Sequence, residues 1–440
     1  MPPARNLYGA QVEGALAPMY PRPLPQATFL EYLPDALRSV EADDADGDAF
    51  SNLEELQAGT NPADATNQPT ATDACVEGTT FRSHDVCNFD AVYTFRKVYL
   101  DFCGRSPTYD ELQTFHTEGA PRAQILQLLE RCMQSEYWLG KNGAVWNLAN
   151  AKINPLRTLK VGEDAPENSV VVFTDYYDDY NFFVYAHTGG RDVRALLTGD
   201  YFVARTDGDT TTPTRYEPFE RSSLDDIRER GFDAAQMVAK DRRAGMITHR
   251  WFLMSHTMFS SLPRTTAAQA YRAYLGLDIS RLEGLQDVPN EPVDYDNKQV
   301  AQTQCAVCHS TLDPLTYPFT RYEGLGGGTG GVRGPARYTP ERLSFFEVVD
   351  GPSVSSTPEA GVIFGQPVDD LVQWAHVAAN SEAFALAVTK DYWRLLTGET
   401  PRASELADYT MLAQDLMTVH GYSVAAMLRQ LIFTEAYSVP

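Results

Sequence analysis

The sequence lacks two features that would indicate a membrane-spanning or nucleic-acid-binding protein. No run of about 18 apolar residues occurs in the 440 residues, so we expect no segment that spans a bilayer. Basic side chains are scarce, since 36 Lys and Arg accompany 59 Asp and Glu, and the formal net charge is −23. Such a charge favours solubility and repels a phosphate backbone, so we expect no nucleic-acid partner.

Cysteine and histidine are also scarce, with 6 and 8 residues, yet they form one compact motif, Cys305-Ala306-Val307-Cys308-His309. Two thiols one helical turn apart can add to the two vinyl groups of haem, and the following imidazole can bind iron. The alternatives are a disulfide or half of a zinc site, but the sequence has neither a second Cys/His cluster nor the βαβ pattern of a redox dithiol. We therefore predict one covalent haem c, with Cys305 and Cys308 as thioethers and His309 as the proximal iron ligand.

The other contacts of this haem are less closely defined by the sequence. We expect a main-chain carbonyl of Asp313 or Pro314 to accept the second ring N–H of His309. Candidates for the sixth iron ligand are Met246, His249 and His376, with Met254, His256 and Met258 nearby in the sequence of the first two. Each Met is more often core filler than a ligand. An open distal position is the further alternative; it permits peroxide or oxygen chemistry, whereas two firm ligands favour electron transfer.

The four remaining cysteines allow three pairings. We expect Cys75–Cys87 as a local clip and Cys103–Cys132 as a tie between adjacent helices, with four free buried thiols as the alternative. Covalent haem implies an oxidising compartment, where disulfides persist, so we expect a periplasmic, extracellular or cell-surface protein. Residues 1–25 lack the basic start, apolar stretch and cleavage site of a signal peptide, and we interpret the sequence as a mature form.

An acidic stretch near the N-terminus fits a twelve-residue calcium loop that begins at Asp44. The expected Ca²⁺ ligands are Asp44, Asp46, Asp48, the carbonyl of Phe50, Asn52 and Glu55. Ala49 departs from the pattern, because glycine usually makes the sharp turn at that position. Together with Gly59-Thr60-Asn61-Pro62, the stretch resembles the thrombospondin type 3-like calcium-binding segments of bacterial surface proteins. An acidic helix cap is the alternative.

Helical periodicity dominates the rest of the chain, so we predict a mainly α fold. Together with the haem motif, this indicates a multi-domain helical c-type cytochrome with long irregular loops and a few short strands. Prolines indicate an extended arm over residues 1–40. Gly104 is expected to end one helix, residues 135–149 to form another, and residues 368–437 to form three. The expected segments are 1–75 (Pro-rich arm, calcium loop and linker), 76–160 (helical), 161–240 (mixed), 241–365 (haem-binding, cytochrome c-like) and 366–440 (C-terminal helical).

Several stretches resemble the planctomycete-type cytochrome c-like domain families of unknown function. Similar segments are Val98 to Thr108 with Glu111-Leu112, Leu196 to Val203, Arg243 to His249, the haem motif with Leu312 to Leu315, and Phe384 to Pro401. The sequence departs from these families at Thr316-Tyr317-Pro318-Phe319, where they usually have Gly-Phe. The resemblance implies a helical, secreted haem protein and no assigned biochemical role.

Three functions follow from these expectations. One haem without a second redox centre suits electron transfer with a redox partner protein or within a larger assembly. A haem enzyme, a peroxidase or oxygenase, requires an open distal pocket with a positioned acid or base. A structural or binding subunit at the cell surface would use haem and calcium to stabilise its fold.

Overall fold

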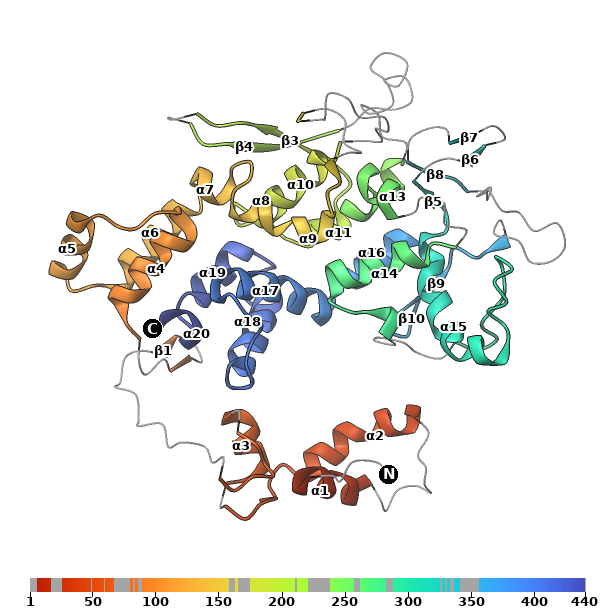
Figure 1. The fold of residues 1–440 in the computed structure, drawn as a ribbon, viewed down its shortest axis with the longest axis horizontal. Coiled ribbons are helices and arrows are strands. Elements are labelled where there is room, and N and C mark those ends of the chain that lie inside the picture. Colours follow the sequence, from red (N-terminus) through yellow and green to blue (C-terminus); the bar gives the residue numbers. More distant parts are fainter. Residues whose placement is uncertain are drawn as a thin grey trace.

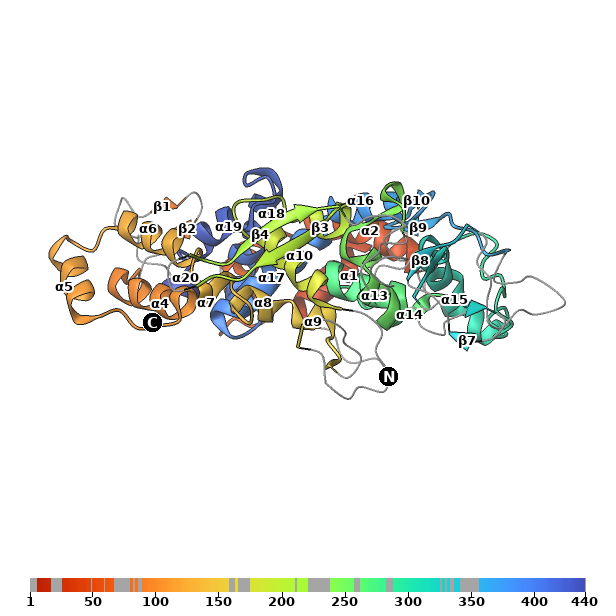
Figure 2. The same cartoon turned by 90° about the horizontal axis from the view of Figure 1, so that it is seen from above.

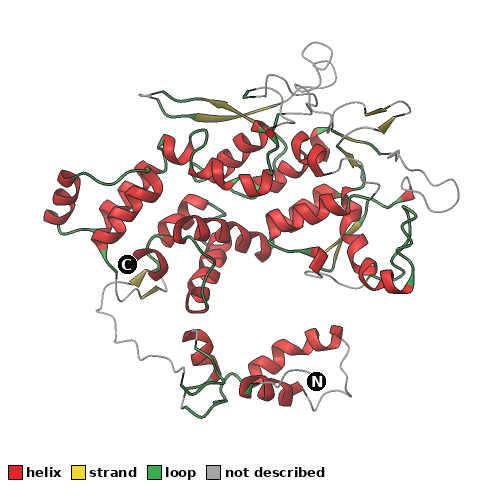
Figure 3. Cartoon of the chain, viewed as in Figure 1, coloured by secondary structure: helices red, strands yellow, loops and turns green. Residues whose placement is uncertain are grey.

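The computed structural model of the chain describes residues 6–16, 26–48, 50–58, 60–66, 80–81, 84–85, 89–157, 163–164, 175–209, 212–220, 238–256, 262–281, 288–324, 327–328, 331–332, 336–340 and 356–439. Helices predominate in these residues, and the strands are short and pair in twos (Figure 3). The predicted mainly α class is therefore confirmed. No helix in the described part of the chain combines the length and the hydropathy that a bilayer crossing needs.

Figure 1 shows the helices and strands along the chain. The helices are α1 (Leu7–Leu16), α2 (Gln26–Ser39), α3 (Asn52–Ala58), α4 (Ala91–Cys103), α5 (Tyr109–Thr117), α6 (Arg122–Cys132), α7 (Glu136–Leu139), α8 (Ala144–Leu148), α9 (Asn150–Ile153), α10 (Tyr177–His187), α11 (Ala195–Thr198), α13 (Arg250–His256), α14 (Arg264–Ala270), α15 (Thr303–Thr316), α16 (Leu371–Ala379), α17 (Glu382–Thr397), α18 (Leu406–Thr418), α19 (Val424–Leu431) and α20 (Glu435–Ser438). Short 3-10 or π turns are η2 (Lys240–Arg242), η3 (Gly245–Thr248), η4 (Tyr271–Leu275), η5 (Ile279–Arg281), η6 (Tyr317–Phe319) and η8 (Ala403–Glu405). The strands are β1 (Thr80–Phe81), β2 (His84–Asp85), β3 (Phe202–Thr206), β4 (Arg215–Phe219), β5 (Tyr322–Glu323), β6 (Gly327–Gly328), β7 (Gly331–Val332), β8 (Arg337–Tyr338), β9 (Gly361–Ile363) and β10 (Gln366–Val368).

The N-terminal segment is helical over residues 7–16 and 26–39, and the predicted extended arm is wrong for these residues. Helices α1 and α2 pack against each other, and α3 follows the acidic loop. Most of the prolines that suggested an extended arm fall before α1 or between the two helices, and only Pro34 lies inside α2. A proline outside a helix removes no bond from its hydrogen-bond ladder, so only Pro34 weakens a helix here, and α2 continues past it.

One cluster of buried side chains runs through the body of the chain from Phe95 to Tyr437. It is built around large aromatic rings; Trp138, Trp251, Trp374 and Trp393 are at most 1% exposed. Helix α17 packs against α18 and η4, and α16 packs against α11, so elements far apart in the sequence share this core. Figures 1 and 2 show an elongated body with α4–α6 at one end and α15 at the other.

Helix ends follow the local signals in most places. Gly104 ends α4 with a left-handed φ of 68°, and Gly398 ends α17 with a φ of 84°, conformations that glycine adopts at little cost. The expected helix over 135–149 is instead two short helices, α7 and α8, and α9 begins only at Asn150. Gly140 and Gly143 are extended and interrupt the ladder. The C-terminal part has five helices, α16 to α20, where three were predicted.

Helix α15 carries the Cys-x-x-Cys-His motif and packs against α14 and β9. The close approach of β9 requires glycine, because a Cβ at Gly361 would lie 2.5 Å from the carbonyl oxygen of Pro314. Pro314 itself lies in the last turn of α15. The motif therefore belongs to a helix that is held on two sides by other elements.

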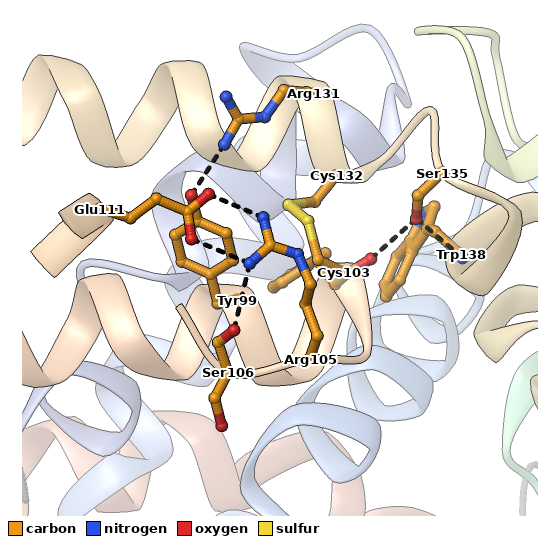
Figure 4. Close-up of a disulfide and its surroundings, with 10 residues drawn as sticks. Tyr99, Cys103, Arg105, Ser106, Glu111, Arg131, Cys132, Ser135 and Trp138 are labelled. Carbon is orange, nitrogen blue, oxygen red and sulfur yellow. Dashed lines mark hydrogen bonds and ion pairs between the residues drawn. A yellow bond between two sulfur atoms is a disulfide. The ribbon is translucent and has the colours of Figure 1, made fainter. Parts of the chain in front are cut away.

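The predicted Cys103–Cys132 disulfide is confirmed. It joins the last residues of α4 and α6, whose Cα atoms are 4.8 Å apart, and ties two helices that also pack side by side (Figure 4). Beside it, Arg105 pairs with Glu111 at 2.8 Å, and Arg131 donates to the Tyr99 hydroxyl (Figure 4). The expected Cys75–Cys87 disulfide lies outside the described residues.

We predict that replacing both Cys103 and Cys132 by Ala lowers the free energy of unfolding by about 3–4 kcal/mol, because the closed loop spans 29 residues. Urea unfolding followed by circular dichroism measures the change. The matched control is a Cys305→Ala/Cys308→Ala variant without haem, which removes two thiols that the structure leaves free. Equal midpoints for the Cys103/Cys132 variant and the wild type would contradict the prediction.

Candidate functional site

The two motif cysteines are free thiols on the surface side of α15. Cys305 is partly buried and Cys308 is exposed, and Val307 between them is 73% exposed. They are separated by one helical turn, so both sulfurs lie along one side of the helix. Accessible thiols at this spacing fit two thioether links to one porphyrin edge.

His309 is oriented by a carboxylate. Its Nδ1 lies 2.9 Å from Oδ1 of Asp313, one turn further along α15, and the Asp313 side chain is fully buried. A neutral imidazole that uses Nδ1 in this bond keeps the lone pair of Nε2 for a metal ion. His309 therefore has the geometry of a proximal ligand with a fixed ring.

The expected partner of His309 was a main-chain carbonyl of Asp313 or Pro314, and this prediction is wrong. The carbonyl of Asp313 accepts the Thr316 hydroxyl at 2.8 Å, and the carbonyl of Pro314 faces Gly361. The side chain of Asp313, and not a main-chain carbonyl, is the partner of the imidazole.

Asp313 is in turn held by Arg264, the first residue of α14. Nε and Nη2 of Arg264 donate to the two carboxylate oxygens at 2.7 and 2.8 Å, and Nη1 donates to Asp296 at 2.7 Å. Burial opposes the charge of Arg264, but the hydrogen bonds and charges of Asp313 and Asp296 outweigh it and hold the pKa of the guanidinium above its ordinary value. One cation and two buried carboxylates thus form a network behind His309.

Sequence reasoning missed Arg264 and Asp296 and assigned Asp313 only a main-chain role. The spacing of Asp313 four residues after His309 was a usable signal, because side chains at i and i+4 of a helix are neighbours. No local signal exists for Arg264 and Asp296, which come from other segments.

The expected distal ligands are scattered over the body. His249 is 2% exposed, lies between the rings of Phe182 and Phe202 at 5.0 and 4.8 Å, and has its Nδ1 3.7 Å from Asp179. Its partners belong to α10 and β3, whereas the network around His309 comes from α14, α15 and residue 296. His249 thus has the contacts of a core residue.

The remaining distal candidates also divide by burial. Met246 and Met254 are 1% and 5% exposed and belong to the hydrophobic core, and His376 is exposed on α16. Met258 lies outside the described residues. His256, at the end of α13, lines a cavity beside α15.

The acidic loop brings its carboxylates together. One oxygen from each of Asp44, Asp46 and Asp48 lies within 4.8 Å of the others. Glu55 on α3 is 0% exposed, and neither of its carboxylate oxygens has a hydrogen-bond partner in the described part of the chain. Both oxygens of Asp46 and Oδ2 of Asp48 are likewise buried without a donor.

Burying so many carboxylate oxygens without donors is costly unless a cation accompanies them. Burial, and then the charges of Asp46, Asp48 and Asp44, raise the pKa of Glu55. Hard oxygen donors converging from a loop and the following helix have the chemistry that Ca²⁺ requires.

Asn52, the expected ligand at position nine, braces the loop through its side chain. Its Oδ1 accepts the main-chain N–H of Ala45 at 3.2 Å, and its Nδ2 donates to Gln11 on α1 at 2.8 Å and to the carbonyl of Val40 at 2.7 Å. The N–H of Phe50 donates to Asp48 at 2.9 Å. The loop is therefore tied to α1 and to the end of α2, while Ala49 lies outside the described residues.

We predict that Asp313→Ala costs about 3 kcal/mol of stability, because it leaves Arg264, whose side chain is 21% exposed, with one carboxylate in a buried network. Urea unfolding measures the loss. The matched control is Asp278→Ala, since Asp278 pairs with the 53% exposed side chain of Arg272 and its loss is expected to move the midpoint far less. Equal midpoint shifts for the two variants would refute a stabilising role for the network.

Comparison with known proteins leaves the chain without a match: no family model, no curated protein and no solved structure matches it.

Proposed function

We propose that this protein is a monohaem c-type cytochrome that transfers electrons outside the cytoplasm to a redox partner protein or within a larger assembly. The observation that carries the proposal is the arrangement on α15, where two free thiols one turn apart accompany an imidazole whose Nδ1 is held by a buried carboxylate. Cys305 and Cys308 would hold haem by thioether links, and His309 would bind its iron through Nε2.

The network behind His309 supports a redox role. A ring that is clamped through Asp313, Arg264 and Asp296 moves little when the charge at the iron changes, which suits electron transfer. When bound, haem supplies the redox chemistry, and the residues of this chain set its orientation and surroundings. The net charge of −23 favours a basic partner by electrostatic steering.

A haem enzyme is the second candidate, and the same contact favours it. A carboxylate partner makes His309 a stronger donor than a carbonyl would, and strong donation stabilises the higher oxidation states of iron used in peroxide chemistry. The two candidates differ in whether the iron has a free position.

We also propose that the acidic loop binds Ca²⁺ through Asp44, Asp46, Asp48 and Glu55, with a structural role. The buried carboxylate oxygens without donors support this assignment. Asn52 accepts from the N–H of Ala45 in the loop and donates to Gln11 of α1, so the bound ion would stabilise the packing of α1 on the loop.

Expression with a c-type cytochrome maturation system tests the haem proposal. We expect one haem per chain that stays attached after denaturation and acid extraction, as shown by mass spectrometry and a Soret band. Cys305→Ser/Cys308→Ser should abolish covalent attachment. His309→Ala should sharply reduce it or leave an abnormal spectrum, while His116→Ala, an exposed residue of α5, should change nothing. Wild-type protein with the mass of the bare polypeptide and no Soret band would refute the proposal.

Calcium titration of the full chain tests the second site. We expect a dissociation constant on the order of 10⁻⁴ M or tighter, and an unfolding midpoint that rises with Ca²⁺ and falls with a chelator. Glu55→Gln should weaken binding by at least about tenfold because it removes a buried ligand charge. The matched control is Asp35→Asn, which removes an exposed carboxylate of α2. A midpoint that ignores Ca²⁺ in the wild type would rule the site out.

A further inference from the structure

One carboxylate oxygen of Asp313 serves two donors. Oδ1 accepts the Nε–H of Arg264 at 2.7 Å and also lies 2.9 Å from Nδ1 of His309, while Oδ2 accepts Nη2 of Arg264 at 2.8 Å. When Nε2 of His309 binds a metal ion, Nδ1 carries the ring proton and donates it to this shared oxygen. The guanidinium and the imidazole therefore draw on the electron density of the same atom.

The charge of Arg264 is permanent, and little water reaches the groups around it. A guanidinium stays protonated in proteins. The side chain of Arg264 is 21% exposed, and those of Asp313 and Asp296 are 0% and 2% exposed. In the described part of the chain, no Lys and no other Arg pairs with Asp313. Because charges interact more strongly where water is scarce, Arg264 controls how much negative charge Asp313 offers to the ring.

Asp296 competes with Asp313 for this cation. Nη1 of Arg264 donates to one oxygen of Asp296 at 2.7 Å, and Nη2 lies 3.5 Å from the other oxygen. One positive charge is thus shared by two buried carboxylates, and neither of them is fully neutralised. A loss of Asp296 would leave the guanidinium to Asp313 alone, whereas a loss of Arg264 would leave the charge of Asp313 to the imidazole.

The charge on Asp313 affects a metal ion bound to His309. A stronger acceptor at Nδ1 makes the imidazole a stronger electron donor through Nε2, and this favours ferric over ferrous iron. A cation bound to the acceptor has the opposite effect. Arg264 therefore counteracts the electron donation that would favour peroxide chemistry, and an intermediate donor strength suits an iron that is oxidised and reduced in turn.

We propose that Arg264 is a positioning residue that acts through Asp313 to raise the midpoint potential of haem bound by His309, and that Asp296 limits this effect. The assignment rests on the proposed function and deepens it, because it identifies the groups of this chain that adapt a carboxylate-bound histidine to electron transfer.

Potentiometric titration of the haem-loaded full chain tests the proposal. Arg264→Gln should lower the midpoint potential, and Asp296→Asn should raise it. We expect each substitution to change the equilibrium constant with a redox mediator by at least about tenfold, which corresponds to about 59 mV for one electron. Arg264→Lys keeps the charge and should retain most of the wild-type potential.

A matched control and a second background make the result specific. Arg272→Gln removes the same group from a 53% exposed side chain that pairs with Asp278, and it should change the equilibrium constant by less than about twofold. Arg264→Gln introduced into an Asp313→Asn protein should lose most of its effect, because no carboxylate is left there for the cation to neutralise. A direct effect of the charge on the iron would persist in that background.

Potential shifts of the same sign for Arg264→Gln and Asp296→Asn, or an Arg264→Gln shift that is as large in the Asp313→Asn background, would overturn the inference while the covalent haem stands. If Arg264→Gln does not fold or does not retain haem, Asp296→Asn decides, and a potential that does not rise overturns the inference. Absence of haem from the wild type would instead overturn the proposed function and this inference with it.

Discussion

The carboxylate of Asp313 is the group on which the candidate site depends. It is fully buried, and it accepts hydrogen bonds from Arg264 on one side while it contacts the imidazole of His309 on the other. Removing a carboxylate from water is costly, and this cost is offset only because a guanidinium with two correctly placed N–H groups reaches it. The orientation of His309 therefore depends on α14 as much as on its own helix.

This dependence links the motif to the wider fold. Helix α14 runs into η4, which packs against α17 in the central core, and α15 is held by α14 and β9. The motif therefore lies on a helix that packs against other elements of the fold. The hydroxyl of Thr266 on α14 also donates to the carbonyl of His256, which ties the end of α13 to the same helix.

The N-terminal segment repeats this principle with a different chemistry. A short loop brings three acidic side chains together, and the charge of nearby Glu55 is buried with no donor among the described residues. Asn52 ties the loop to α1, so a cation that neutralised the carboxylates would also stabilise the helices around it. In both places an arrangement of buried charge is stable only with its counter-charge, which is a guanidinium at Asp313 and, in our proposal, Ca²⁺ at Glu55.

Local sequence signals determined the helical class, the glycine caps at Gly104 and Gly398, the Cys103–Cys132 pairing and the positions of the Cys-x-x-Cys-His and acidic motifs. These features depend on residues close in the sequence or on a simple choice among few cysteines. Predictions from local signals were wrong at residues 7–16, 26–39 and 135–149, where the helix bounds depend on the exact positions of proline and glycine. Only the tertiary structure decided that Arg264 and Asp296 support His309, that Asn52 braces its loop, and that His256 lies at the cavity beside α15 while His249 is enclosed in the core. The physical reason is that such partners come from different elements, and their approach is set by the packing of the helices, which no local periodicity records.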